Sequence, residues 1–346
     1  MIKEAITSLV EGRSLSMEQA AQVMEEIMGG GVTPAQFGAF VTALRIKGET
    51  ADEIAGLASI MRAKAVRVMA TDPVIDIVGT GGDNSNSFNI STAAAFVAAG
   101  AGIRVAKHNN RAMTSHCGSA DVLEALGVRI NLDANQVKDC LKRVGIGFMF
   151  APGFHPAMKF ATAPRREIGI RTVFNILGPL TNPALAESMV IGVPSEELGE
   201  KIVQVLLRLG SKHSLVVHGL NGMDELSIAA KSRVWELQED KITNYFVSPE
   251  DFGLARAGME TVKGGTPAEN AAMLRSVLEG EPGPRRDVVL MNAAAGVVVG
   301  SRTGHPSGLP ALKEGIEIAR EAIDSGRALD RLQKLVSLSQ SFKPGE

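Results

Sequence analysis

The chain has 346 residues, 45% of them hydrophobic, and is long enough to bury two separate cores. Its 36 basic and 38 acidic side chains nearly cancel, and a net charge of −2 argues against nucleic acid or an anionic membrane as a partner. One Trp and one Tyr leave few aromatic rings for stacking bases. The two cysteines, Cys117 and Cys140, have no metal-ligand spacing and suit a reducing compartment, so we expect a cytoplasmic protein. No apolar run approaches the length needed to cross a membrane, so we expect no membrane-spanning segment.

Residues 1–70 are predicted to form a small all-helical domain. Apolar residues recur there at helical spacing, and the glycines at 29–31 and 48 suit helix ends. Three helix starts have the capping-box spacing, in which a Ser or Thr is followed three residues later by Gln or Glu. These pairs are Ser16 with Gln19, Thr33 with Gln36, and Thr50 with Glu53.

Residues 71–346 are predicted to form a larger α/β domain with a mostly parallel central sheet and flanking helices. Short β-branched runs alternate there with segments rich in Ala and Leu, the pattern of strands joined by crossover helices. The expected strands are 74–79, 103–108, 189–193 and 214–219, and the expected helices are 92–99, 119–126 and 196–209. The segment 165–187 breaks this alternation with a Pro- and Gly-punctuated helical pattern, and we expect it to join the helical domain.

A glycine-rich loop, "DIVGTGGDNSNSFNIST" at 76–92, lies between a predicted strand and a predicted helix. It lacks the Lys-Ser/Thr pair of a P-loop, and the third glycine of a dinucleotide loop would fall on Asn84. A simple tight turn is the alternative to a phosphate site. The hydroxyl and amide side chains before the helix exceed what capping needs, which favours a polyanionic ligand.

Two further polar segments follow predicted strands. "KHNNRAMTSHCGSADVLEALG" at 107–127 offers basic and hydroxyl side chains, with a solvated loop as the alternative. "GMDELS" at 222–227 places two adjacent acids after a strand. Ligands bind at the carboxyl ends of strands in an open α/β sheet, and paired carboxylates suit Mg²⁺ shared with substrate phosphates. Taken alone, such a pair is more often surface charge.

These segments resemble the anthranilate phosphoribosyltransferases of tryptophan biosynthesis, whose fold is similar to that of the nucleoside phosphorylases. The resemblance runs nearly end to end and includes "GTGGD", "NIST", "GSADVLEALG", "RREIGIRTVFNILGPLTNP" and "DELS". It implies Mg²⁺-dependent transfer of the phosphoribosyl group of phosphoribosyl pyrophosphate to the amine of anthranilate. It further implies a homodimer formed through the helical domain, with two Mg²⁺ ions per monomer.

The resemblance also implies which residues bind each substrate. Anthranilate would contact Gly79, Asn110 and Arg165, with the Arg165 guanidinium pairing its carboxylate. One Mg²⁺ would be held by Ser91 and Glu225, and the other by Asp224 and Glu225. No general base is assigned. The phosphoribosyl pyrophosphate site would comprise Gly79, Gly82, Asp83, Ser87, Asn89, Ile90, Ser91, Thr92, Lys107, His108, Asn109, Asn110, Arg111, Ala112, Met113, Thr114, Ser115 and Ser119.

Two positions depart from the family pattern. Asn109 stands where the family usually has glycine. Asn tolerates a left-handed backbone better than other non-glycine residues, so the turn can form, but we expect its side chain to narrow the path of the aromatic acceptor. His116 stands where the family often has a basic residue, which makes the loop charge depend on pH. The alternatives are therefore a phosphoribosyltransferase for another aromatic amine, a pyrimidine nucleoside phosphorylase, and, least favoured, a non-catalytic relative that binds nucleic acid.

Overall fold

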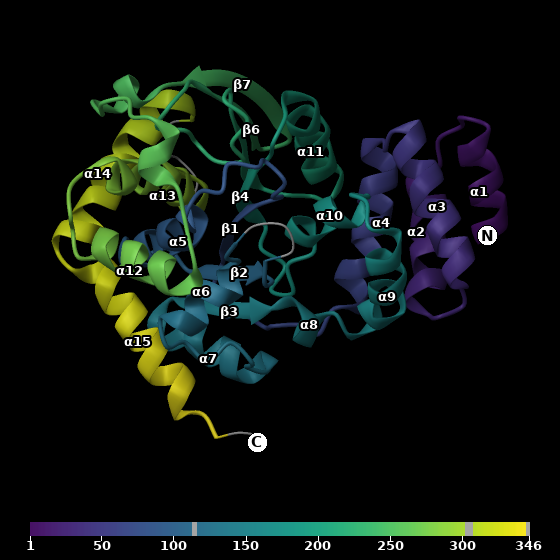
Figure 1. Cartoon of the computed structure of the whole chain (residues 1–346), viewed down its shortest axis with the longest axis horizontal. Coiled ribbons are helices and arrows are strands. Elements are labelled where there is room, and N and C mark those ends of the chain that lie inside the picture. The colour runs from purple at the N-terminus through teal and green to yellow at the C-terminus, as the bar shows by residue number, and fades with distance from the viewer. Residues whose placement is uncertain (113–115, 302–306, 344–346) are drawn as a thin grey trace.

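The computed structural model describes residues 1–112, 116–301 and 307–343. The chain forms a small helical lobe beside a larger α/β lobe, as Figure 1 shows. This arrangement confirms the predicted fold class. The helical lobe begins with α1 (Ile2–Val10), α2 (Met17–Met28), α3 (Pro34–Lys47) and α4 (Ala51–Lys64).

The first helices start where the sequence places them. Ser16, Thr33 and Thr50 are the N-caps of α2, α3 and α4, and each forms both hydrogen bonds of a capping box. A capping box satisfies backbone N–H groups that have no partner within the helix. The three predicted helix starts are therefore confirmed at the level of individual hydrogen bonds.

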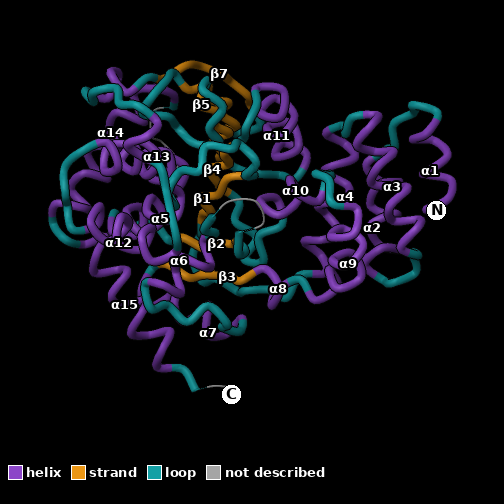
Figure 2. The backbone as a smooth tube through the Cα atoms, in the orientation of Figure 1, coloured by secondary structure: helices purple, strands orange, loops and turns teal. Residues whose placement is uncertain are grey.

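A single seven-stranded sheet forms the centre of the larger lobe, in the order β3-β2-β1-β4-β5-β6-β7 (Figure 2). The first five strands in this order are parallel, and β6 and β7 are antiparallel to their neighbours. The carboxyl ends of β2, β1, β4 and β5 therefore meet at one edge. The strands are β1 (Ile75–Gly79), β2 (Val105–Asn109), β3 (Ile146–Phe150), β4 (Ser188–Gly192), β5 (His213–Gly219), β6 (Ser232–Gln238) and β7 (Lys241–Val247).

Helices cover both faces of this sheet. In Figures 1 and 2, α5, α13 and α14 lie on one side, and α11 lies on the other, toward the helical lobe. The single Trp, Trp235 of β6, packs under α11 against Gly199, where a Cβ would lie 2.3 Å from the indole. The helices are α5 (Ile90–Gly100), α6 (Ser119–Ala125), α7 (Ala134–Val144), α11 (Glu196–Arg208), α12 (Pro267–Leu278), α13 (Pro284–Gly300), α14 (Gly308–Asp324) and α15 (Arg327–Ser341).

The chain returns to the helical lobe between β3 and β4. Helix α9 packs against α2 and α3, and α10 packs against α4. This return brings residues 159–177 beside the N-terminal helices, although they are separated in sequence by the first part of the sheet. The elements are α8 (Ala151–Phe154), α9 (Lys159–Ile168) and α10 (Phe174–Leu177), with short 3₁₀ turns at Pro156–Met158 and Gly178–Leu180.

The structure adds elements that the sequence patterns did not predict. These include β3, the antiparallel strands β6 and β7, the helices α7, α12, α13, α14 and α15, and the 3₁₀ turns Pro249–Phe252 and Met259–Val262. Helix α5 also begins at Ile90, two residues before its expected start, so Ser91 and Thr92 lie in its first turn. Within the described residues, no helix is both long and apolar enough to span a bilayer.

Candidate active site

Two glycines at the carboxyl ends of neighbouring strands leave space for Asp224. A Cβ on Gly79, at the end of β1, would lie 2.2 Å from Oδ2 of Asp224. A Cβ on Gly192, at the end of β4, would lie 1.5 Å from its carbonyl oxygen. The loop that follows β5 therefore folds back over the ends of β4 and β1, which any larger side chain at these positions would block.

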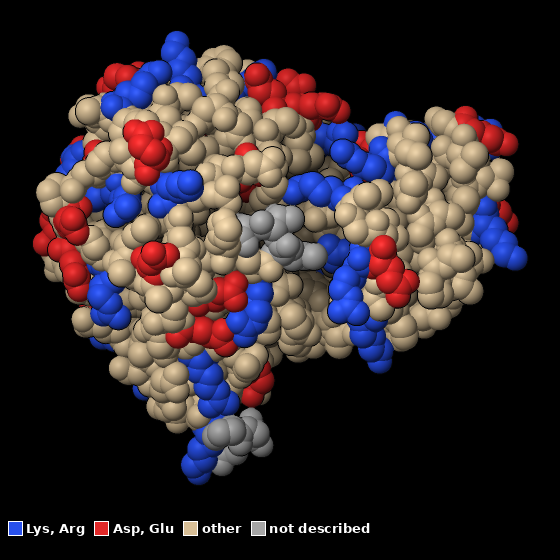
Figure 3. Space-filling model, viewed as in Figure 1, with Lys and Arg blue, Asp and Glu red and all other residues tan. Residues whose placement is uncertain are grey.

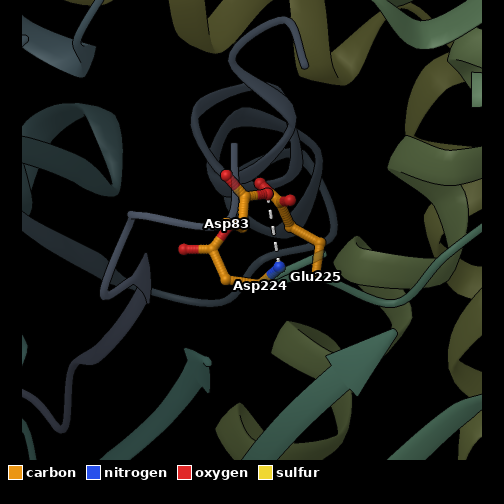
Figure 4. A group of neighbouring side chains, drawn as sticks. All are labelled: Asp83, Asp224 and Glu225. Atoms are coloured by element: carbon orange, nitrogen blue, oxygen red, sulfur yellow. Dashed lines mark hydrogen bonds between the residues drawn. The ribbon is translucent and has the colours of Figure 1, made fainter. Parts of the chain in front are cut away.

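Asp224 forms an acidic cluster with Glu225 and Asp83 (Figure 4). One oxygen from each of the three carboxyl groups lies within 4.8 Å of the other two. The Asp224 N–H donates to Oδ2 of Asp83 at 3.5 Å, which ties the loop after β5 to the loop after β1. The sequence analysis assigned Asp83 to the phosphoribosyl pyrophosphate site, and the structure places it with the two expected metal ligands.

The electrostatics of this cluster favour a bound cation. Burial, reinforced by the negative charge of Asp83, raises the pKa of Asp224 to about 7. Burial and the neighbouring Asp224 charge also raise the pKa of Glu225 well above its usual value. The Oε2 atom of Glu225 is buried and has no hydrogen-bond partner among the described residues. Three oxygen donors with mutually repelling charges and one buried oxygen without a partner fit Mg²⁺.

Part of the glycine loop is already hydrogen-bonded within the protein. The Thr80 N–H donates to the Gly192 carbonyl at 2.9 Å, and the Gly81 N–H donates to Oδ2 of Asp224 at 2.7 Å. The N–H groups of Gly82 and Asp83 have no partner among the described residues. A phosphate at this loop would therefore meet the amides of Gly82 and Asp83 rather than those of the whole glycine run.

Side chains bridge an opening between β1 and β2. The two strands pair only at Ile75 and Val105, and beyond this pair Lys107 Nζ donates to the Ile77 carbonyl at 2.6 Å. Lys107 Nζ also lies 3.3 Å from Oγ of Ser91, an expected metal ligand. Burial lowers the pKa of Lys107 to about 8, against the opposing charge of Asp76.

Asp76 of β1 also bridges the opening between β1 and β2, through hydrogen bonds. Its Oδ2 accepts hydrogen bonds from the backbone N–H of His108 at 3.3 Å and from Nδ2 of Asn182 at 2.7 Å. Burial raises the pKa of Asp76 to about 6, although the Lys107 charge opposes this rise. Asp76 and Asn182 thus fix the backbone that carries Lys107 and His108.

His108 does not supply the positive charge that its place in the loop suggested. Its ring is buried 5.0 Å from the ring of His155, centroid to centroid. Burial, together with the neighbouring imidazole, lowers the pKa of His108 to about 3. At neutral pH this side chain is therefore an uncharged imidazole, and it adds no positive charge to the carboxyl end of β2.

Arg111 is held by acids of the following helix. Its guanidinium donates to Asp121 Oδ1 at 3.0 Å and forms a two-pronged contact with Glu124. Oδ2 of Asp121 also accepts the N–H groups of Ala112 at 3.0 Å and Gly118 at 2.9 Å. Asp121 thus joins the two ends of the loop, a role that the sequence analysis did not identify.

The position where the family usually has glycine needs no special backbone. Asn109 ends β2 and is not among the residues with positive φ, and its Oδ1 accepts the Asn110 N–H at 2.8 Å. Asn110 Oδ1 accepts the Arg111 N–H in the same way, at 2.8 Å. Asn109 continues an extended strand, so the left-handed backbone that Asn tolerates is not required at this position.

The remaining expected site residues lie in the first turns of α5 and α6 or in the segments just before them. Asn89 Nδ2 donates to the Cys117 carbonyl at 3.1 Å, and Thr92 Oγ1 donates to Ser119 Oγ at 3.1 Å. Ile90 is fully buried, and Ser87 forms an isolated β-bridge with Lys263. Three expected site residues, Met113, Thr114 and Ser115, lie outside the described residues.

The segment that returns to the helical lobe carries two arginines, of which Arg171 contacts the glycine loop and Arg165 packs on an aromatic ring of the helical lobe. Arg165, near the end of α9, stacks on Phe174 with 5.2 Å from Cζ to the ring centroid, and burial lowers its pKa. Phe174 in turn contacts Phe37 of α3 at 5.3 Å between centroids. Arg171, between α9 and α10, donates from Nη2 to the Gly81 carbonyl at 3.1 Å.

Comparison with known proteins agrees with this arrangement. A family model described as the glycosyl transferase family α/β domain matches residues 71–329, and the corresponding helical bundle domain matches residues 3–65. An anthranilate phosphoribosyltransferase from Dehalococcoides mccartyi is 59% identical over 347 residues, which cover 100% of both chains. The chain belongs to the anthranilate phosphoribosyltransferase family.

Solved structures of this family have the same fold. The enzyme from Thermus thermophilus is 44% identical, with a TM-score of 0.90 over 97% of this chain and 99% of that one. The enzyme from Saccharomyces cerevisiae, in complex with phosphoribosyl pyrophosphate and Mg, is 31% identical, with a TM-score of 0.88 over 99% and 98%. A structure of the yeast enzyme with 4-fluoroanthranilate is 30% identical, with a TM-score of 0.86 over the same shares. The family resemblance read from the sequence is thereby confirmed.

The sequence analysis missed roles that depend on contacts distant in the chain. Arg171 lies within the quoted "RREIGIRTVFN" and Asp121 within "GSADVLEALG", but neither was assigned a role. The only sign of Arg171 in the sequence was that a basic residue lies in the segment 165–187, which was expected to join the helical domain. No local pattern indicates that its guanidinium reaches the loop 90 residues earlier in the chain.

Proposed function

We propose that this chain transfers the phosphoribosyl group of phosphoribosyl pyrophosphate to the amine of anthranilate in tryptophan biosynthesis. The products are N-(5-phosphoribosyl)anthranilate and pyrophosphate. The observation that carries the proposal is the cluster of Asp83, Asp224 and Glu225 beside a glycine loop, in a chain of this family. Such a cluster suits a magnesium-bound diphosphate, which is the leaving group of this reaction.

Two Mg²⁺ ions per monomer would be held at this cluster, one by Ser91 and Glu225 and the other by Asp224 and Glu225. Asp83 is positioned to join the second set, because its carboxylate lies with theirs. The ions would neutralise charge on the departing pyrophosphate. The yeast relative has been solved with phosphoribosyl pyrophosphate and Mg, which supports the ligand class.

The acceptor would be bound by Arg165, Asn110 and Gly79. The Arg165 guanidinium stacks on Phe174, so its edge remains suited to a two-pronged contact with the anthranilate carboxylate. The aromatic amine is neutral at pH 7 and needs no base before it attacks the anomeric carbon. Alignment of the two substrates would then supply roughly 7–11 kcal/mol of the rate enhancement, which is why no general base is assigned.

A fluorescence assay tests the activity directly. Protein, Mg²⁺, phosphoribosyl pyrophosphate and anthranilate are mixed, and the fluorescence of free anthranilate is expected to fall as the product forms. Substituted aminobenzoates in place of anthranilate test the alternative acceptors, and phosphorolysis of pyrimidine nucleosides tests the phosphorylase alternative. An absence of anthranilate consumption with active phosphorolysis would overturn the proposal.

Glu225→Gln tests the metal role. We expect kcat to fall by about 100-fold or more, because the shared ligand of both ions is weakened, while the unfolding midpoint changes little. The matched control is Glu314→Gln, whose side chain is exposed on α14 and lies outside the acidic cluster. Unchanged turnover of Glu225→Gln at saturating Mg²⁺ would contradict the assignment.

The helical domain, residues 1–70 with 165–187, would form a homodimer in the cytoplasm. Val10 of α1 and Ile46 of α3 are 72% and 82% exposed, and α1 packs beside α3, so both offer apolar surface on the same lobe.

The cytoplasmic location is supported by the two free, buried cysteines, which suit a reducing compartment. The dimer is tested on the purified chain. Light scattering on the purified chain is expected to give the dimer mass, and Ile46→Glu is expected to shift it toward the monomer. A monomeric wild type would contradict the dimer.

A further inference from the structure

The guanidinium of Arg171 lies against the glycine loop from the side of the helical lobe. Nη2 donates to the Gly81 carbonyl, and a Cβ on Gly82 would lie 1.5 Å from Nη1. Gly82 has φ +77°, so both its conformation and its neighbour require glycine. The absence of a side chain at Gly82 is thus what allows a cation to rest directly on this loop.

The charge of Arg171 is not neutralised by any acid among the described residues. The hydrogen bond to Gly81 uses one of its five N–H groups, and no described carboxylate forms an ion pair with it. Arg171 is half-buried, so its other N–H groups remain accessible. Arg111 differs, because Asp121 and Glu124 already occupy its guanidinium.

Unused donors converge at this point of the loop. The N–H groups of Gly82 and Asp83 have no partner within the described part of the chain, and the free edge of Arg171 lies beside Gly82. The Gly81 N–H, by contrast, is bound to Asp224 of the acidic cluster. One residue of the loop therefore joins the expected magnesium ligands to the arginine. Figure 3 shows Lys and Arg side chains on the face where the two lobes meet.

We propose that Arg171 binds the diphosphate of the donor substrate and stabilises it as it leaves. The inference rests on the proposed function, because it takes the diphosphate to lie between the acidic cluster and the glycine loop. In the transfer, the amine lone pair forms the new C–N bond and the electron pair of the C–O bond departs with pyrophosphate. One N–H proton is then released. The negative charge that grows on the leaving oxygens is met by a guanidinium that is already positioned.

Direct binding of magnesium pyrophosphate tests this role without turnover. Calorimetry compares the wild type with Arg171→Gln and Arg171→Lys, using ribose 5-phosphate as a ligand that lacks the diphosphate. We expect Arg171→Gln to weaken pyrophosphate binding by about 10–100-fold, which corresponds to about 1.4–2.8 kcal/mol, because one charge-assisted, two-pronged contact is lost. Arg171→Lys is expected to bind pyrophosphate with an affinity between those of the wild type and Arg171→Gln, since an ammonium keeps the positive charge but lacks the planar fork that presents two parallel N–H groups to a phosphate. Ribose 5-phosphate binding is expected to stay unchanged.

Arg166→Gln is the matched control, because Arg166 is exposed on neighbouring α9 and forms no ion pair within the described residues. It is expected to bind pyrophosphate like the wild type. Trp235 emission checks that each variant is folded, and Arg171→Lys decides the matter by the same criterion if Arg171→Gln does not fold.

Three results would overturn the inference. Arg171→Gln could bind pyrophosphate as tightly as the wild type, or it could raise only the KM for anthranilate, which would make Arg171 an acceptor residue. It could also weaken ribose 5-phosphate and pyrophosphate equally while lowering the unfolding temperature, which would make Arg171 a structural clamp. A wild type that binds magnesium pyrophosphate but consumes no anthranilate would instead overturn the proposed function alone.

Discussion

At the residue scale, Asp224 occupies space that Gly79 and Gly192 leave free at the ends of two strands. The contact at Gly79 involves the Asp224 carboxylate, which can rotate away. The contact at Gly192 involves the Asp224 backbone, which cannot move without displacing its loop. The two glycines therefore make different demands on the same residue.

Gly192→Ala is expected to destabilise the protein by about 1–3 kcal/mol and to abolish most activity, because the added methyl overlaps the Asp224 carbonyl. Gly79→Ala is expected to lose activity with a smaller loss of stability, since a carboxylate can turn. Urea unfolding and the anthranilate assay measure the two effects. Gly153→Ala is the control, because a Cβ there meets nothing within 4 Å, and a change of less than about 0.5 kcal/mol is expected. Equal stability of all three variants would contradict the packing argument.

Single residues could be assigned from the sequence where the chemistry is local or belongs to a familiar motif. Asp224 and Glu225 were identified because two adjacent acids follow a strand. Asp83 was placed at the loop but not among the metal ligands, because its neighbours lie 141 positions away. His108 was counted among the basic side chains of its segment, and only its burial, which lowers its pKa to about 3, shows that it is uncharged at neutral pH.

At the element scale, the N-terminal helices were predictable because a capping box is contained within four residues. The hairpin of β6 and β7 was not. Its turn residues, Glu239 and Asp240, have φ of 49° and 61°. Two-residue hairpin turns with positive φ at both positions usually have the sequence Asn-Gly or Asp-Gly, which is how they are recognised in a sequence. This hairpin carries no glycine at the turn, so the usual sequence signal is missing.

Asp240→Gly is expected to stabilise the protein by about 0.5–1 kcal/mol, because glycine takes a left-handed backbone without a steric penalty. The midpoint of urea unfolding, followed by far-ultraviolet circular dichroism, measures the change. Glu279→Gly serves as the comparison, since its φ of −78° gains nothing from glycine. A midpoint for Asp240→Gly below that of the wild type would show that the turn is not strained.

The same hairpin contains a buried carboxylate whose charge stabilises the fold. Burial alone would raise the pKa of Glu236, but hydrogen bonds from His213, Tyr245 and the Gly308 N–H outweigh it and hold the pKa below its usual value. The stabilisation is therefore present above the ordinary carboxyl pKa of about 4.3, and it is lost as the pH falls through the lowered pKa of the folded state.

Glu236→Gln is expected to be less stable than the wild type at pH 7 by about 1–3 kcal/mol, because neutral hydrogen bonds replace charged ones. The difference should begin to shrink as the pH falls below about 4.3, and it should approach zero only below the lowered pKa of the folded state, where the wild-type carboxylate is protonated too. Urea unfolding at a series of pH values measures it. A constant difference across this range would mean that the charge of Glu236 contributes nothing.

At the scale of the whole molecule, the two lobes are joined by buried polar contacts as well as by apolar packing. Arg62 of α4 donates from Nε to the Leu180 carbonyl at 2.6 Å and from Nη1 to the Leu209 carbonyl at 3.5 Å. Burial lowers the pKa of Arg62 to about 10, so it remains charged at neutral pH. One side chain of α4 thereby satisfies a carbonyl of the returning segment, at Leu180, and a carbonyl of the α/β lobe at the end of α11, at Leu209.

Arg62→Met is expected to lower the free energy of unfolding by about 1.5–3 kcal/mol, because the Leu180 carbonyl loses a charged donor in a partly buried site. Urea unfolding measured by circular dichroism gives the value. Arg67→Met is the matched control, since Arg67 is exposed, and we expect it to change the stability by less than about 0.5 kcal/mol. Equal effects of the two variants would remove Arg62 as a link between the lobes.

The two-lobe architecture was predictable from the change in sequence texture near residue 71, because helical spacing and alternating strands differ in period. We expected the segment 165–187 to join the helical domain from its Pro- and Gly-punctuated pattern, whereas α9, which packs on α2 and α3, begins earlier, at Lys159. The order of the strands was not, because pairing such as that of β1 with β4 joins residues more than a hundred positions apart. Sheet order is decided by long-range packing that a single sequence does not display.

Trp235 is enclosed between β6 and α11, with Arg233 over its ring at 4.9 Å. Because it is the only tryptophan in the chain, the tryptophan fluorescence of the protein reports the packing of α11 on β6. Ligand titrations that rely on protein emission would therefore report poorly on the crevice. The fluorescence of anthranilate itself reports substrate binding more directly, because a single tryptophan adds little background emission.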